Sequence, residues 1–198
     1  YRILQPELGS AGEILCLSNM LPTLMGMLIM IYVGALDDIV GLTPKARFVI
    51  EILVILGLIF STGNCIDSLH GLWGIESFSW YIAVPLTVLT GVGIINAINM
   101  IDGVNGLSSG LCITYCILFG TVFLAIGDIK NSVLAFTMAA SLWLFFVHNV
   151  FGKTSRMFIG DAGTMVMGIL MTWFVISLTN QNMSHVMLGD DVSVVAML

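Results

Sequence analysis

Three short polar clusters stand out in an otherwise strongly apolar chain, and the first contains two adjacent aspartates. Asp37 and Asp38 lie in the segment Gly34–Arg47, which ends with the basic residues Lys45 and Arg47. Neighbouring carboxylates at the edge of an apolar environment repel each other unless a cation or a proton lies between them. A divalent cation or the proton of a phosphate group would fill that place. The alternative is a solvated helix end with basic residues on the next turn.

The second cluster places two amides and a carboxylate on one face of a helix. Asn96, Asn99 and Asp102 are spaced i, i+3, i+6 at the start of the segment Asn96–Gly110. Their oxygen atoms suit magnesium, which shares its coordination with phosphate groups. An amide can also recognise the edge of a nucleobase, because it both donates and accepts. The alternative is hydrogen bonding between helices, which accounts for one asparagine better than for the whole cluster.

Two glycines predict that this helix ends within the cluster. Gly103 and Gly106 follow the carboxylate, and Asn105 lies between them. Glycine favours a break and allows a ligand to approach the backbone. We therefore expect Asn105 to lie on a turn beside the predicted ligand.

The third cluster has an aspartate among small residues at the start of an apolar run. Asp161 lies between Gly160 and Gly163 in the segment Arg156–Gly168. Backbone N–H groups at a helix N-terminus favour anions. Asp161 is therefore either a helix cap or a ligand for a cation that bridges such anions.

The three clusters together indicate a metal and phosphate site if they meet on one side of the protein. Asn149 closes an apolar run just before the third cluster and could reach the same pocket. Glu51 lies inside an apolar run, where an ionisable residue is a candidate for function. Its i, i+4 spacing from Arg47 also permits a simple ion pair, so we leave Glu51 outside the candidate site.

Composition indicates that the elements holding these clusters are membrane spans. Of the 198 residues, 58% are hydrophobic and 9% are charged, whereas a soluble domain carries about 25% charged residues. A span needs about 20 apolar residues. We predict an all-α, polytopic transmembrane bundle forming a single domain over residues 1–198, with six spans and the start of a seventh at Val192. The apolar runs are Ile14–Leu36, Phe48–Ile66, Ser77–Ile101, Gly103–Gly127, Asn131–Gly152 and Ala162–Gly189.

The distribution of basic residues predicts which side the clusters face. If the spans alternate, residues 37–47, 99–106 and 151–161 fall on one side of the membrane. Most of the basic residues fall there too, and only two fall on the other side. The positive-inside rule makes the first side cytoplasmic. The basic residues of the first side are Lys45, Arg47, Lys153 and Arg156, and those of the second are Arg2 and Lys130.

The sequence also bears on three other classes of function: nucleic-acid binding, transport, and a structural role in the membrane. A net charge of −6 without a basic stripe argues against a nucleic-acid partner. A transporter or channel with a cation site would place polar residues near the bilayer midplane, between broken helices. Here the polar residues gather at one interface. A structural membrane scaffold leaves the acidic clusters unexplained.

The order and spacing of the three clusters resemble the motifs of a known family. Asp37-Asp38 resembles its DD motif, Asn96 through Leu107 its N-x-x-N-x-x-D-G-x-D-G-L motif, and Phe158 through Thr164 its F-x-G-D-x-G-S motif. The family is that of the polyprenyl-phosphate N-acetylhexosamine-1-phosphate transferases (glycosyl transferase family 4, WecA/MraY-like). The chain is most similar to the bacterial undecaprenyl-phosphate GlcNAc-1-phosphate transferase type.

The resemblance implies a phosphotransferase of the bacterial inner membrane, with its active site facing the cytoplasm. Its substrates would be a UDP-sugar, with UDP-GlcNAc expected first, and undecaprenyl phosphate. Transfer of the sugar-1-phosphate would release UMP and initiate cell-envelope polysaccharide synthesis. Magnesium is the implied cofactor, with manganese as a substitute, and a homodimer is the implied assembly.

The resemblance also implies roles for individual residues. Asp161 would bind magnesium with Asn99 as a co-ligand, and Asp37 or Asp38 would position or deprotonate the lipid phosphate. The residues implied in substrate binding are Asn96 and Asp102 in the nucleotide pocket, Asn105 at the uracil, Lys45 and Arg47 after the DD motif, and Asn149.

The chain departs from the family pattern in three respects. Asn105 stands where the second motif ends in aspartate, and Thr164 stands for a serine. The family's first spans and its His-containing loop near the C-terminus are not found in these residues. We therefore expect the chain to be a fragment of a longer transferase.

Overall fold

The computed structural model describes residues 9–68, 77–152 and 158–180, with the side chains of the first helix described from residue 20 onward. All regular elements in these ranges are helices. They are α1 (Gly9–Val40), α2 (Pro44–Thr62), α3 (Trp80–Ile101), α4 (Leu107–Ala125), α5 (Ile129–Phe151) and α6 (Gly160–Thr179). The predicted all-α fold is confirmed for this part of the chain.

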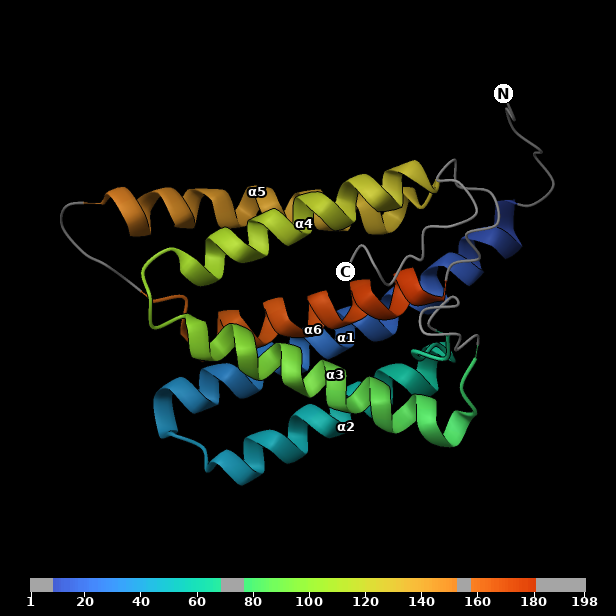
Figure 1. The fold of residues 1–198 in the computed structure, drawn as a ribbon, viewed down its shortest axis with the longest axis horizontal. Helices are drawn as coiled ribbons and strands as arrows, with labels where there is room; N and C mark the ends of the chain where they lie inside the picture. The colour runs from blue at the N-terminus through green and yellow to red at the C-terminus, as the bar shows by residue number, and fades with distance from the viewer. Residues whose placement is uncertain (1–8, 69–76, 153–157, 181–198) are drawn as a thin grey trace.

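Helix α6 is the central element of the bundle. Helices α1 and α3 pack along it, α2 packs against both of them, and α4 and α5 form a hairpin on the other side (Figure 1). Most side chains of α6 are buried whichever way they point. Phe174 of α6 packs against Phe119 and Phe123 of α4. A helix that is apolar all round belongs in a core, and the other helices surround it.

Small residues allow two neighbours to approach the backbone of α6 closely. A Cβ atom on Gly34 of α1 would lie 2.3 Å from the Cα of Ala162. A Cβ atom on Gly168 of α6 would lie 2.6 Å from the Cα of Ile95 on α3. Close backbone approach at small residues is typical of helix packing in membranes. It fixes α1 and α3 against α6.

Five helices are long and apolar enough to cross a membrane. They are α1 from Met20, and α3, α4, α5 and α6. Helix α2 differs because Lys45, Arg47 and Glu51 lie in its first half. The predicted run from Val192, and the basic residues Lys153 and Arg156, lie outside the described residues. The chain is thus a helical, multi-pass membrane protein.

The ends that carry the polar clusters meet at one end of the bundle, on the left of Figure 1. Helix α1 ends there and α2 begins there, after a turn with Gly41 at φ 71°. Thr43 caps α2, its hydroxyl accepting a hydrogen bond from the Ala46 amide at 3.4 Å. The predicted break after α3 is confirmed, because residues 102–106 form a turn with Gly106 at φ 74°.

Candidate active site

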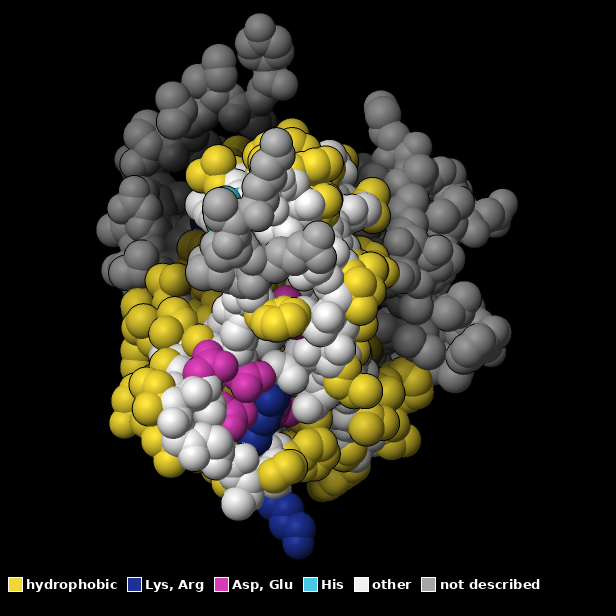
Figure 2. All heavy atoms as spheres, turned by 90° about the vertical axis from the view of Figure 1, so that its left-hand side faces the viewer, with side chains coloured by type: hydrophobic (Ala, Val, Ile, Leu, Met, Phe, Trp, Pro, Cys, Tyr) yellow, Lys and Arg dark blue, Asp and Glu magenta, His cyan; other side chains and the backbone are white. Residues whose placement is uncertain are grey.

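Acidic and basic side chains gather on this end of the bundle, within a rim of hydrophobic residues (Figure 2). Arg47 is the centre of the cluster. Its Nη1 donates to Asp37 Oδ2 at 3.4 Å and to Asp161 Oδ1 at 3.1 Å, and its Nε donates to Glu51 Oε1 at 3.1 Å. Three carboxylates therefore share one guanidinium. The excess of negative charge favours the binding of a further cation.

Asp37 is held by the turn that follows α1. Its Oδ1 accepts a hydrogen bond from the Leu42 amide at 2.7 Å, while Oδ2 faces Arg47. The side chain is 11% exposed, so most of it is enclosed by the bundle. The same contact closes the α1–α2 turn and aims a carboxylate oxygen at the site.

Asp38 caps the N-terminus of a different helix. Its two oxygens accept hydrogen bonds from the amides of Asp161 at 3.0 Å and Ala162 at 3.3 Å. Helix α6 has no cap from its own N-cap residue, Ile159. A carboxylate at this position satisfies unpaired amides and interacts favourably with the helix dipole. Asp38 itself is exposed.

The interpretation of Asp161 as a helix cap is therefore wrong. Its backbone amide is capped by Asp38, and the N-cap position of α6 belongs to Ile159. Asp161 Oδ1 accepts hydrogen bonds from Arg47 and from the side-chain amide of Asn99. In the structure its partners are therefore the Arg47 guanidinium and the Asn99 amide, and its role as a cation ligand stays a prediction.

The two asparagines of α3 lie on the same face of the helix but contact different partners. The Nδ2 atom of Asn99 donates to Asp161 and, at 2.9 Å, to Thr164 Oγ1. The Nδ2 atom of Asn96 donates to Glu51 Oε2 at 2.5 Å and to the Val92 carbonyl at 2.9 Å. The i, i+3 spacing thus ties α3 to both α6 and α2.

Asp102 connects the turn after α3 to the start of α6. One carboxylate oxygen accepts from the Ser108 hydroxyl, and the other accepts from the Ile159 amide at 3.0 Å. Asp102, one turn along α3 from Asn99, thus contacts the first turn of α4 and the backbone just before α6. Asp102 therefore shapes the segment that presents Asp161.

The remaining predicted residues lie around this network. Lys45 and Asn105 are exposed at the same end of the bundle. Asn149 is 3% exposed and lies two residues before the end of α5. Among the predicted residues, Asp37 and Asp161 are thus joined through Arg47, and Asp38 is joined to the backbone of Asp161.

Glu51 is the residue that sequence reasoning left outside the site. The predicted i, i+4 ion pair with Arg47 is confirmed. The contact with Asn96 was not foreseen, because these residues are separated by 45 positions. Glu51 is 1% exposed, and it links two predicted substrate-binding residues.

The site offers two carboxylates, Asp37 and Asp161, as candidate oxygen ligands for the magnesium that the family resemblance implies. Within the described ranges no group of three or more His, Cys, Asp or Glu side chains is arranged to hold a metal ion. Magnesium is nevertheless commonly bound by one or two carboxylates, with water and substrate phosphates completing an octahedron. Asp37 Oδ2 and Asp161 Oδ1 both contact the cationic Nη1 of Arg47, so in this structure Arg47 supplies the positive charge between them and a magnesium ion there stays a prediction.

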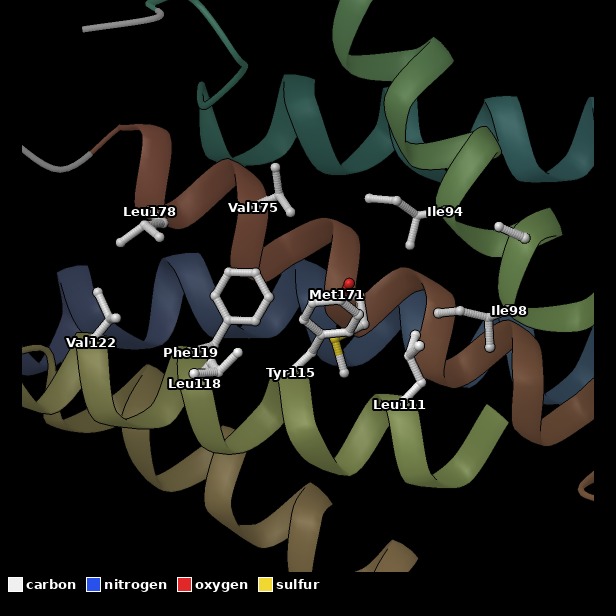
Figure 3. Close-up of a pocket in the computed structure, with 11 residues that line it drawn as sticks. Ile94, Ile98, Leu111, Tyr115, Leu118, Phe119, Val122, Met171, Val175 and Leu178 are labelled. Carbon is white, nitrogen blue, oxygen red and sulfur yellow. The ribbon is translucent and has the colours of Figure 1, made fainter. Parts of the chain in front are cut away.

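An apolar cavity of about 330 Å³ lies between α3, α4 and α6. Figure 3 shows Leu111, Tyr115 and Val122 following one side of α4, opposite Ile94 and Ile98 of α3. Ile98 precedes Asn99 on α3, and Leu111 lies near the start of α4. The cavity therefore runs away from the polar end along the length of the bundle.

Comparison with known proteins places the chain in a family. The profile described as glycosyl transferase family 4 matches residues 20–179. The chain belongs to glycosyl transferase family 4. The matched range includes all three motifs and all six described helices except the first turns of α1.

Similar curated proteins within this family are transferases. A Bacillus subtilis (strain 168) protein named "Probable undecaprenyl-phosphate N-acetylglucosaminyl 1-phosphate transferase" is 35% identical over 145 residues, covering 73% of this chain and 40% of that protein. The undecaprenyl-phosphate alpha-N-acetylglucosaminyl 1-phosphate transferase of Yersinia pestis is 28% identical over 160 residues, 78% of this chain and 43% of that protein. A phospho-N-acetylmuramoyl-pentapeptide-transferase of Streptococcus equi subsp. zooepidemicus (strain MGCS10565) is 26% identical over 168 residues, 78% and 49% respectively.

The chain spans less than half the length of these three members of the family. None of the three is named as a transporter or channel, so the comparisons give no support to that alternative.

Proposed function

We propose that the whole protein transfers GlcNAc-1-phosphate from UDP-GlcNAc to undecaprenyl phosphate, releases UMP, and thereby initiates cell-envelope polysaccharide synthesis. The observation that carries the proposal is the convergence of the three motifs on Arg47 and its carboxylate partners. The names of the first two relatives support the lipid substrate and the transferred sugar.

Magnesium would be held by Asp161 and Asp37, with manganese able to substitute. Asn99 presents its Nδ2 atom to Asp161, so it orients that ligand and could offer its own oxygen only after its amide turns over. When bound, the metal supplies a Lewis acid that neutralises phosphate charge. Arg47 supplies a second positive charge beside the Asp37 and Asp161 oxygens that would hold the metal. Phosphoryl transfer usually needs such positive charges to stabilise the phosphate oxygens.

The reaction would be an in-line displacement at phosphorus. An oxygen of the lipid phosphate forms a bond to the β-phosphorus of the UDP-sugar, and the bond from that phosphorus to the bridging oxygen of UMP breaks. Of the two aspartates Asp37 and Asp38, Asp38 would position the lipid phosphate and accept its proton if it arrives protonated. Asp38 is the exposed member of the pair and is the better placed to meet a substrate from outside.

The nucleotide pocket would be formed by the end of α3 and the turn after it. Asn96 and Asp102 would shape it, and Asn105, exposed on the turn, would face the uracil. Lys45 and Asn149 would complete the substrate-binding residues from either side. These roles rest on the motif resemblance and on the common location of these residues at one end of the bundle.

The membrane arrangement follows from the same assignment. We place the protein in the bacterial inner membrane with the site facing the cytoplasm, as the positive-inside rule indicates. Helix α2 would be a further span, whose charged first half lies at the site, and the run from Val192 would start a seventh. A homodimer is the expected assembly.

The apolar cavity in Figure 3 is a candidate groove for part of the polyprenyl tail. Its walls are mostly hydrocarbon, and its lining residue Ile98 directly precedes Asn99 in the chain. Ala97 lines it, so Ala97→Trp should fill it and raise the KM for undecaprenyl phosphate severalfold, leaving the KM for UDP-GlcNAc unchanged. An equal effect on both substrates, or on neither, would place the tail elsewhere.

The experiment that tests the proposed function uses the full-length protein in detergent with undecaprenyl phosphate. A panel of UDP-sugars is supplied, and UMP release is measured with magnesium and with a chelator. Magnesium-dependent UMP release with UDP-GlcNAc is the expected result. Absence of release with every sugar, from folded full-length protein, would overturn the proposal and return attention to ion-flux assays.

A further inference from the structure

Glu51 is a buried carboxylate at the junction of α2 with the active-site network. It is 1% exposed, and an ionised group in an apolar bundle is costly unless it is paired. Both oxygens are paired, Oε1 with the Nε of Arg47 at 3.1 Å and Oε2 with the Nδ2 of Asn96 at 2.5 Å. The two partners are themselves predicted substrate-binding residues.

The contact with Nε controls the direction of the whole Arg47 side-chain terminus. A guanidinium is planar and its five N–H groups have a fixed geometry. Once Nε is held by Glu51, the positions of Nη1 and Nη2 are set by the plane. Nη1 then reaches Asp37 and Asp161 together. Nη2 is buried and has no hydrogen-bond partner among the described residues.

Without Glu51, Arg47 would have a more favourable arrangement that blocks the site. Guanidinium and carboxylate groups prefer paired, parallel hydrogen bonds, and Asp161 is already within reach of Nη1. Freed at Nε, the guanidinium could turn and close both nitrogens on Asp161. That arrangement would engage both carboxylate oxygens of Asp161, whereas in the structure Arg47 contacts Asp161 through Oδ1, and it would take Nη1 away from Asp37.

We propose that Glu51 is a positioning residue for the transfer reaction, because it holds Arg47 in the orientation shared by Asp37 and Asp161 and fixes Asn96 beside them. It does so from behind the site, through these two side chains. The proposal rests on the proposed function for its kinetic consequence and on the Arg47 geometry for its effect on cation binding.

The test compares four full-length proteins: wild type, Glu51→Gln, Arg47→Gln and the double variant. Three quantities are measured for each: kcat/KM for UMP release, the Kd of Mn²⁺ by electron paramagnetic resonance without substrates, and the Tm. Ser132→Ala is the control, since Ser132 is 2% exposed and donates to the Gly120 carbonyl between α4 and α5, outside the network.

Glu51→Gln should lower kcat/KM about tenfold or more, the effect of one charge-assisted hydrogen bond. It should also weaken Mn²⁺ binding severalfold, while its Tm stays close to that of the Ser132→Ala control. When Arg47 is already Gln, adding Glu51→Gln should change the Kd of Mn²⁺ by less than about twofold, because the effect acts through Arg47.

Three results would overturn the proposal. They are kinetics and Mn²⁺ affinity equal to those of the control, an effect of equal size with and without Arg47, and no Mn²⁺ binding by the wild type. Absence of UMP release by the wild type would instead reject the proposed function, and the Mn²⁺ measurements would still decide the coupling. If Glu51→Gln does not fold, Glu51→Asp replaces it, because it keeps the charge but withdraws the carboxylate, and the same losses are expected.

Discussion

Replacing Gly34 with alanine should separate α1 from α6 at the active site. The added Cβ would lie 2.3 Å from the Cα of Ala162, 2.5 Å from its nitrogen and 2.7 Å from the carbonyl carbon of Asp161. All three atoms are backbone, so no side chain can rotate away. Ordinary van der Waals contact begins at 3.4 Å, so the helices must move apart by about 1 Å.

That movement would act directly on the site. Asp38 of α1 holds the first turn of α6 through hydrogen bonds of 3.0 and 3.3 Å, and a shift of this size breaks them. Overpacking costs about 1–3 kcal/mol of stability. A displacement of about 1 Å in a catalytic arrangement costs about a hundredfold in rate. We therefore expect Gly34→Ala to lower the rate of UMP release about a hundredfold while destabilising the protein by about 1–3 kcal/mol.

The assay uses the full-length enzyme in detergent, with UMP release at saturating substrates and thermal unfolding measured in parallel. Gly57→Ala on α2 is the matched control, because a Cβ atom at Gly57 meets no described atom within 4 Å. It should retain wild-type activity and Tm. Activity of Gly34→Ala within about twofold of the control would refute the close backbone approach as the determinant of site geometry.

Three further predictions concern single side chains. Asp161→Asn should lower UMP release at least about a hundredfold while the protein still inserts and purifies normally, and near-normal activity would contradict its assignment as metal ligand. Trp173→Phe removes the 2.9 Å hydrogen bond from Nε1 to the buried Asn131 and should lower stability by about 1 kcal/mol. An unchanged unfolding midpoint would show that this contact between α5 and α6 contributes nothing. Burial, with a smaller effect from Asp67, raises the pKa of the Cys65 thiol. Its thiolate fraction is therefore low near neutral pH, and maleimide labelling of folded protein, followed by peptide mass spectrometry, should be slow there and accelerate only above the pH range of an ordinary cysteine. Rapid labelling at pH 7 would show that the thiol is exposed.

Sequence patterns predicted the features that depend on local chemistry. Apolar run lengths located the helices, and alternation of spans brought the three clusters to one end. The break after α3 followed from Gly103 and Gly106, and the Arg47–Glu51 ion pair from i, i+4 spacing. Each of these depends on residues that are neighbours in the chain, so the sequence carries the signal.

Contacts between distant segments could not be predicted in the same way. Asp38 caps α6 from 123 positions away, and no pattern near residue 160 announces a cap supplied by another helix. Local reasoning therefore offered a helix cap as one of two interpretations of Asp161, and that interpretation was wrong. The pairing of Glu51 with Asn96 likewise depends on how α2 packs on α3. Helix packing thus decides that Asp38 caps α6 while the carboxylate of Asp161 contacts Arg47.

The central position of α6 has a consequence for how the protein is made. In the described part of the chain, α6 is the last helix to be synthesised, yet it separates the group α1–α3 from the hairpin α4–α5. Until it enters the membrane, the inner faces of both groups lack their main partner. Arg47 likewise lacks one of its three carboxylates, and Asp38 lacks the amides that it caps. The contacts of Arg47 with Asp161, and of Asp38 with the α6 amides, can therefore form only after α6 has been synthesised.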